Sequence, residues 1–238
     1  MIEEIIKKNL IPANLFIFGF ADLRGLTGGK KDGFHYGISI GKKLDDKIID
    51  EIKNGPTLEY YNHYKKINNE LAELTGKIHS DLSKAGIDSL MINPTVLEGT
   101  EEYSEEYLRT LTVDISHKMV ATRAGLGWIG KSDLFISRAF GPRLRLVSML
   151  LRQKPDHLPV PVEKSECGKC RLCVTKCPAK AATGKLWNTT IHRDDFFNAH
   201  KCREKCAELA HKKFNIDVRI CGICVSVCPI PLPVRSAF

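Results

Sequence analysis

The chain has 238 residues, enough for one large domain or two modest ones. It is 43% hydrophobic with a formal net charge of +8 and a pI near 9.0, which is compatible with a nucleic-acid partner. No apolar run approaches the length of a membrane span, and the first residues, MIEEIIKKNL, are amphipathic and carry early acids, unlike a signal peptide. We therefore exclude a membrane role and expect a protein of the reducing cytoplasm.

The chain before the first cysteine predicts a mixed α+β domain. Alternating apolar residues predict short strands at 15–20 and 34–40. Apolar residues at three- and four-residue steps predict a long helix from Thr57 to Ala85, and Gly86 is the expected stop.

A second set of elements follows this helix. We expect a strand at Ser89–Ile92, a polar acidic stretch at 98–106, and a helix with Ser116 as its N-cap. RLRLVSMLL from Arg143 alternates and then becomes mostly apolar, which predicts a strand that enters the core.

Prolines and charge divide the chain at nearly the same place. The proline-bearing stretch 155–161 favours extended backbone, so we expect an α+β cofactor or substrate domain at 1–160 and a cysteine-rich domain at 161–238. Residues 1–166 contain 23 Lys+Arg and 23 Asp+Glu, whereas residues 167–238 contain 13 and 5. The basic excess therefore belongs to the cysteine-rich segment.

Seven of the nine cysteines follow the spacing of iron–sulfur ligands, and one of the other two completes a set of eight. One motif, C-x2-C-x2-C-x3-C-P, begins at Cys167, and a second, C-x2-C-x3-C-P, begins at Cys221. Three thiolates on one loop can each reach a different iron of one 4Fe–4S cube, while the fourth cysteine ligates the other cluster. We expect Cys167, Cys170, Cys173 and Cys228 to hold one cluster, and Cys177, Cys221, Cys224 and one further cysteine to hold the other.

The second motif lacks a ligand three residues before Cys221, where Val218 stands. Cys202 and Cys206 remain, and their spacing of four places them on the same face of a predicted helix. Either could serve. We favour Cys202 and keep Cys206 as the alternative.

Three other interpretations are weaker. A zinc ribbon needs two C-x2-C pairs and has no use for a third cysteine at that spacing. A disulfide framework is typical of short secreted chains. The third interpretation is a nucleic-acid partner, which the basic excess would attract. Eight thiolates contribute about −8 and two oxidised cubes about +4, so binding of the clusters would itself balance much of that excess.

The segment AGLGWIGKSDLF contains G-x-G-x-x-G, but a helix is predicted before it and a strand after it, the reverse of a dinucleotide loop. We favour close backbone packing around Trp128, with approach to a flat cofactor as the alternative. The candidate cofactor-binding residues are Gly125, Gly127, Trp128, Gly130 and Lys131.

These motifs carry a family resemblance. HKMVATRAGLGWIGKSDLF, FGPRLRL and CGKCRLCVTKCPAKAATGKLW leading to CGICVSVCP resemble the epoxyqueuosine reductase family and its shorter iron–sulfur relatives. The resemblance implies a domain like that of cobalamin-dependent reductive dehalogenases, followed by a ferredoxin-like domain with two 4Fe–4S clusters that feed electrons to cobalamin. It also places Cys202 at the isolated ligand position, and the family's substrate is a modified base in tRNA.

Two departures from the family concern tRNA and the proton donor. The chain stops at Phe238, without the helical-repeat region that helps to hold tRNA in the family. Asp114 matches the family's proposed proton donor but lies three residues closer to the glycines, and His117 stands where the family has glutamate. His117 is a candidate for proton transfer near neutral pH, although packing against a neighbour is favoured.

We expect an iron–sulfur reductase that acts on an unidentified small molecule or modified base. A low-potential ferredoxin or flavodoxin is its expected electron donor. An electron-transfer protein that serves a partner enzyme and an epoxyqueuosine (tRNA) reductase are the alternatives.

Overall fold

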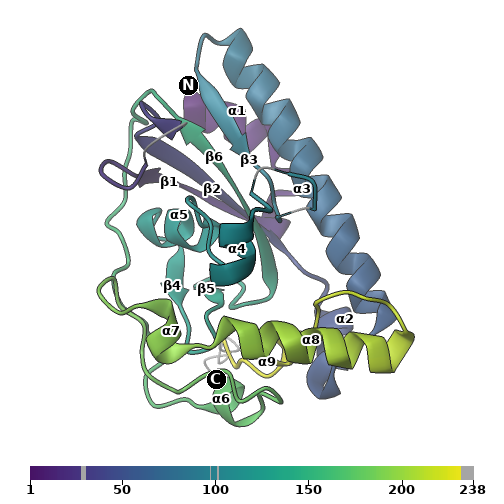
Figure 1. Ribbon diagram of the computed structural model, residues 1–238. Coiled ribbons are helices and arrows are strands. Elements are labelled where there is room, and N and C mark those ends of the chain that lie inside the picture. The colour runs from purple at the N-terminus through teal and green to yellow at the C-terminus, as the bar shows by residue number, and fades with distance from the viewer. Residues whose placement is uncertain (28–30, 97, 101, 232–238) are drawn as a thin grey trace, which may run out of the picture. The chain divides into compact units, whose positions relative to one another are not determined.

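The computed structural model describes residues 1–27, 31–96, 98–100 and 102–231 (Figure 1). Residue 101 of the expected acidic stretch and residues 232–238 of the expected second domain lie outside the described residues. The chain forms two compact units, of which the first comprises Met1–Lys43, Tyr64–Leu126 and Arg145–Val162, and the second Leu44–His63, Gly127–Leu144 and Glu163–Phe238. The division at 160/161 stays a prediction, since the second unit also draws on two earlier segments.

The first unit is built on a four-stranded sheet. Its strand order is β1 (Phe16–Asp22), β2 (Tyr36–Lys43), β6 (Leu144–Leu151) and β3 (Ser89–Ile92). β1 pairs with β2 antiparallel, and β3 pairs with β6 antiparallel. All four strands expected from the sequence are confirmed, with ends that differ by at most a few residues.

β6 is an interior strand of this sheet, and its sequence shows why. Met149, Leu150 and Leu151 are all completely buried, so successive side chains on both faces of the strand are covered. A strand that is buried on both faces loses the polar–apolar alternation of an exposed sheet. This explains the change from alternation to a continuous apolar run within RLRLVSMLL.

Helices complete the first unit. They are α1 (Ile2–Asn9), the part of α3 (Leu58–Lys84) from Tyr64 onward, α4 (Glu105–Thr110) and α5 (His117–Arg123), with a short 3-10 helix at Ala13–Leu15. The long helix is confirmed, and Leu71, Ile78 and Leu82 on its apolar face are fully buried. Gly86 ends it with φ +73°, a left-handed conformation that glycine adopts without a steric penalty.

Polar bonds join α3 to the sheet. Lys42 of β2 pairs with Glu70, and Arg145 of β6 donates to the side-chain oxygen of Asn68 at 3.0 Å. α5 packs on β1 and β2. One apolar cluster links α5 to β1, β6 and the adjoining loops: Ala21, Leu23, Phe34, Ile115, Val120, Ala124 and Leu150. It holds the start of α5, and therefore His117, in place.

The second unit contains short elements around the cysteines. They are α2 (Asp46–Glu51), a 3-10 helix (Ile52–Asn54), β4 (Gly127–Ile129), β5 (Phe135–Ser137), α6 (Leu172–Thr175), α7 (Arg193–Phe196), α8 (Ala199–Phe214) and α9 (Ile223–Ser226). β4 and β5 form an antiparallel pair. Helices α6 and α9 pack together, and each carries one cysteine, Cys173 and Cys224 respectively.

A separate apolar core supports the cysteines of this unit. It comprises Ile129, Ala181, Ala182, Phe196 and Phe197, with Cys177 and Cys202 packed at its margin. None of the helices in the described ranges has both the length and the apolar character that a membrane crossing requires.

Candidate functional site

The structure brings the first group of predicted ligands together. Cys167, Cys170, Cys173 and Cys228 all line one cavity of about 60 Å³ in the second unit, and Cys224 reaches the same cavity. Burial raises the pKa of the Cys228 thiol to about 11, and the negative charges of Cys167, Cys173 and Cys170 act in the same direction. Thus Cys228, distant in sequence, shares its surroundings with the three cysteines of the first loop.

The second group gathers around Cys224. Burial raises the pKa of this thiol, and the charges of Cys221, Cys202, Cys173 and Cys177 raise it further. Apart from Cys173, these neighbours are the ligands expected for the second cluster. Cys173 and Cys224 therefore each neighbour members of both expected sets, and the division of the thiols between two clusters stays a prediction.

Cys202 and Cys206 both lie within this second group. Their sulfur atoms are 3.9 Å apart on α8. A hydrogen bond with Cys206 lowers the pKa of Cys202, and another lowers that of Cys221 to about 7, whereas the same bonds raise the pKa of Cys206. The choice of Cys202 over Cys206 stays a prediction, since both sulfurs are close to the other candidate ligands.

The donor set suits iron–sulfur clusters. All nine cysteines lie within the described residues, and none forms a disulfide. No three or more His, Cys, Asp or Glu side chains of the described ranges converge in a way that could hold a metal ion. A 4Fe–4S cube instead spreads its four thiolates over four irons, and the fit therefore rests on the two cysteine groups and on the cavity that the first group lines.

The GLGWIGK segment lies against the first cysteine loop. Trp128 is buried, and its indole N–H donates to the sulfur of Cys167 at 3.4 Å. A hydrogen bond with Ser132 opposes the rise that burial causes in the pKa of Cys173. The Lys131 ammonium donates to the carbonyls of Gly168 and Cys170 at 2.7 and 2.8 Å.

The glycines of this segment make room for the backbone. A Cβ at Gly127 would lie 2.0 Å from the carbonyl oxygen of Ile136 on the paired strand, and one at Gly130 would lie 3.0 Å from the Ile136 side chain. Gly125 ends α5 with φ +68°. As expected, the G-x-G-x-x-G pattern joins a helix to a strand. The role of Gly125, Gly127, Trp128, Gly130 and Lys131 toward cobalamin stays a prediction.

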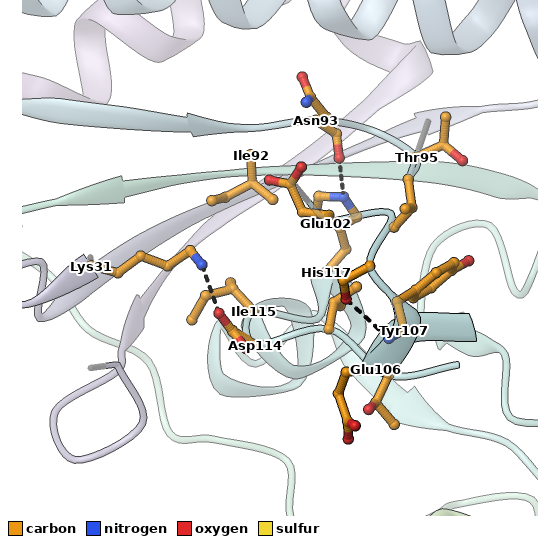
Figure 2. A pocket seen from close by; sticks show the side chains of 14 residues that line it. Lys31, Ile92, Asn93, Thr95, Glu102, Glu106, Tyr107, Asp114, Ile115 and His117 are labelled. Atoms are coloured by element: carbon orange, nitrogen blue, oxygen red, sulfur yellow. Dashed lines mark hydrogen bonds and ion pairs between the residues drawn. The ribbon is translucent and has the colours of Figure 1, made fainter. Parts of the chain in front are cut away.

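The first unit contains a pocket of about 400 Å³, shown in Figure 2. Its lining comes from the end of β3 and the loop after it, from α4, from the segment that leads into α5, and from Lys31 ahead of β2. Asp114 and His117, the two candidate catalytic residues, both line it. The volume lies within the range of small-molecule sites.

His117 is held by both ring nitrogens. Its Nε2 lies 2.8 Å from the carbonyl oxygen of Asn93 (Figure 2). Its Nδ1 lies 2.9 Å from the hydroxyl of Ser148. Burial lowers the pKa of His117 to about 4, the Asn93 carbonyl opposes this, and the charge of Arg145 adds to it. At neutral pH the ring is uncharged, so Nε2–H donates to Asn93 and Nδ1 accepts from Ser148.

Asp114 is exposed and pairs with Lys31, whose ammonium lies 3.1 Å from its Oδ2 (Figure 2). Glu102 and Glu106 also line the pocket, and Glu106 pairs with Arg109. The sequence pattern did not single out Lys31 or Tyr107. The acidic stretch that supplies Glu102 and Glu106 was visible, but nothing in its composition indicated a pocket.

The comparisons with known proteins begin with the cysteine segment. Residues 166–231 match the family described as "4Fe-4S double cluster binding domain". This range contains all nine cysteines.

Curated relatives cover a larger part of the chain. The epoxyqueuosine reductase of Lactococcus garvieae is 30% identical over 151 residues, which are 59% of this chain and 40% of that protein. The epoxyqueuosine reductase of Vibrio cholerae is 28% identical over 122 residues, 50% of this chain and 27% of that protein. The chain thus matches less than half the length of either relative.

Solved structures extend the likeness to the fold. The epoxyqueuosine reductase from Streptococcus thermophilus superposes with a TM-score of 0.58 at 20% identity, covering 96% of this chain and 64% of that one. A reductive dehalogenase whose structure is described as suggesting a mechanism for B12-dependent dehalogenation gives a TM-score of 0.63 at 14% identity, covering 90% and 29%. The expected combination, a cobalamin-reductase-like fold with a ferredoxin-like double-cluster domain, is confirmed, as is the resemblance to the epoxyqueuosine reductase-like family.

Proposed function

We propose that this epoxyqueuosine reductase-like chain is an iron–sulfur oxidoreductase that passes electrons through two 4Fe–4S clusters to a cofactor of its N-terminal domain and so reduces a substrate. The observation that supports the proposal is the convergence of thiols: five cysteines line one cavity, and Cys177, Cys202 and Cys221 lie close to Cys224, so enough thiolates for two cubes are near one another. Cys167, Cys170, Cys173 and Cys228 would hold the first cluster. Cys177, Cys202, Cys221 and Cys224 would hold the second.

Cobalamin is the proposed cofactor, supported by the fold shared with a protein described as acting in B12-dependent dehalogenation. When bound, a corrin would supply a strongly reducing metal centre for the difficult bond cleavage. The pocket of about 400 Å³ suits a drug-sized group, and a whole corrin is much larger. We therefore propose that this pocket binds the substrate. A corrin would need a binding surface larger than this pocket.

Two residues of the pocket have different proposed roles. Asp114, which pairs with Lys31, is the proposed proton donor because it matches the family's proposed donor and lines the pocket. His117 is uncharged at neutral pH with both nitrogens bonded, so we assign it to orienting the pocket wall through Asn93 and Ser148. Proton transfer by His117 near neutral pH is less favoured on this geometry.

The experiment that tests the proposal measures iron, sulfide and cobalt in protein purified without oxygen and incubated with cobalamin. About eight irons per chain, with corrin retained in stoichiometric amount, are expected. Eight irons without corrin would favour an electron-transfer protein or a reductase with another cofactor. About four irons or none would contradict the two-cluster assignment.

Reduction of epoxyqueuosine in tRNA is the second candidate, and the names of the curated relatives favour it. One of the similar structures holds an epoxyqueuosine-modified tRNA stem loop, which is a suitable probe. Conversion of such a stem loop by the reduced, cobalamin-loaded chain would establish this activity. If protein with full iron and corrin does not convert the stem loop, the chain acts on a different substrate.

A low-potential ferredoxin or flavodoxin is the proposed electron donor, because reduced clusters of this kind require a strong reductant. A reducing cytoplasm is the proposed setting, since it keeps thiols available for iron. Titration of the oxidised clusters with reduced ferredoxin or flavodoxin, followed by their visible absorbance, tests the donor.

A further inference from the structure

Lys131 is a charged side chain in an unusual place. It is only 3% exposed. Its ammonium donates to two backbone carbonyls, and no carboxylate of the described residues pairs with it. A buried ammonium that meets only neutral oxygens is costly unless a negative charge lies nearby.

Glu166 lines the same cavity as Lys131 but pairs with Arg138, so the first cysteine loop is the other source of negative charge there. The two carbonyls belong to Gly168 and Cys170, which lie within the C-x2-C-x2-C motif. Lys131 also lines the same cavity as Cys167, Cys173 and Cys228. Four thiolates around an oxidised cube leave a net charge of about −2, which would compensate the ammonium.

The position of Lys131 follows from the segment that carries it. Trp128 and Ser132 on either side bond Cys167 and Cys173, and the β4–β5 pair holds the segment in register. The ammonium cannot swing to solvent without breaking both carbonyl bonds and leaving a buried site. Its charge is therefore fixed beside the loop rather than averaged over many side-chain rotamers.

We propose that Lys131 is a positioning residue for the first cluster, whose ammonium holds the Cys167–Cys173 loop by two carbonyls and raises the reduction potential of that cluster. Reduction adds one electron to the cube, delivered by the external donor, and a fixed positive charge stabilises the more negative product. Net charge and hydrogen bonds around the sulfurs are recognised determinants of cluster potential. The inference rests on the proposed two-cluster assignment.

The test is a redox titration of the clusters in oxygen-free full-length protein, followed by electron paramagnetic resonance. Lys131→Met removes the charge and the donors, Lys131→Gln keeps a donor without the charge, and Lys131→Arg keeps the charge. Lys169→Met is the matched control, because Lys169 lies in the same loop but is exposed.

In Lys131→Gln and Lys131→Met, one of the two reduction steps should move to a more negative potential while the other stays unchanged. Lys131→Arg should restore the potential toward that of the unmodified protein, and Lys169→Met should leave both steps in place. Loss of half the iron in Lys131→Met alone, with Lys131→Arg retaining it, would support the loop-holding role.

Unchanged potentials in Lys131→Gln, or an equal shift in Lys169→Met, would overturn the proposal. If Lys131→Met does not fold, Lys131→Gln and Lys131→Arg still separate charge from packing. Absence of two clusters from the unmodified chain would refute the proposed function. If the unmodified chain holds two clusters and the Lys131 variants leave both reduction potentials unchanged, only this inference is refuted.

Discussion

The cysteine groups of the second unit and the pocket of the first are assembled in different ways. Cys167, Cys170, Cys173 and Cys177 come from one short loop, whereas the pocket draws side chains from as far apart as Lys31 and His117. Three ligands of a cube come from one short loop at set spacings, so this kind of site can be recognised from local sequence. A pocket requires only that a surface be concave and polar in places, and many sequences satisfy that condition.

The largest expected effect comes from replacing cluster ligands among the cysteines. Cys170→Ser and Cys224→Ser should each lose one cluster, because a serine hydroxyl is a poor replacement for a thiolate ligand of iron. Iron and sulfide analysis should give about half the content of the unmodified protein. Cys206→Ser is the control and should keep both clusters if Cys202 is the ligand. Unchanged iron in both ligand variants would refute the assignment.

The β4–β5 pair beside the first cysteine loop offers the next test. Gly127→Ala should destabilise the protein by about 3 kcal/mol, since the added Cβ would lie 2.0 Å from the backbone oxygen of Ile136, which cannot move freely. Gly76→Ala in α3 is the control, because nothing lies within 4 Å of a Cβ there and alanine favours helix. Urea unfolding of both variants measures the difference. Equal stability would contradict the packing role of Gly127.

The pocket side is tested by the pH dependence of stability. The pKa of His117 is about 4 in the folded chain against 6.5 for the free side chain. Between these values the unfolded chain binds the proton and the folded chain does not, so acid favours unfolding. The stability that His117 contributes is complete above about pH 6.5 and should fall by roughly 2 kcal/mol as the pH drops to 4, allowing for partial exposure of the ring.

His117→Gln should lack this decrease. The measurement is the difference in urea midpoint between the unmodified protein and the variant from pH 7 to pH 4, in which acid effects common to both proteins cancel. At pH 7 the variant should itself be less stable by about 1 kcal/mol, because Ser148 and Asn93 lose optimal partners. Parallel curves for the two proteins would contradict the lowered pKa.

The smallest effect concerns the rim of the first cysteine loop. Arg138 makes two bonds of 2.6 Å to Glu166 and lies 5.6 Å from the centre of the Trp128 ring, but both charged side chains are well exposed. Solvent screens such a pair, so Arg138→Met should cost less than about 1 kcal/mol and retain both clusters. Loss of a cluster would show that this ion pair holds the loop.

Part of the fold could be predicted because local patterns carry it. The strand at Ser89–Ile92 and the helix that Gly86 ends agree with the structure, since periodicity and a left-handed glycine act within a few residues. The sheet order β1-β2-β6-β3 could not be predicted, because it pairs segments separated by long stretches of chain.

The same division holds for the candidate site. Spacing alone indicated two clusters and assigned Cys228 to the first, and the structure places it in the cavity with those cysteines. Spacing could not show that Trp128, Lys131 and Ser132 bond that loop, because this depends on the turn from β4 into β5.

The sequence by itself determined the cofactor class, since iron imposes a ligand type and a spacing that few other functions require. Only the tertiary structure decided the surroundings of His117 and Lys131. His117 bonds Ser148 and Asn93, and Lys131 bonds the carbonyls of Gly168 and Cys170. Folding brings these partners close, and the sequence around His117 and Lys131 does not indicate them.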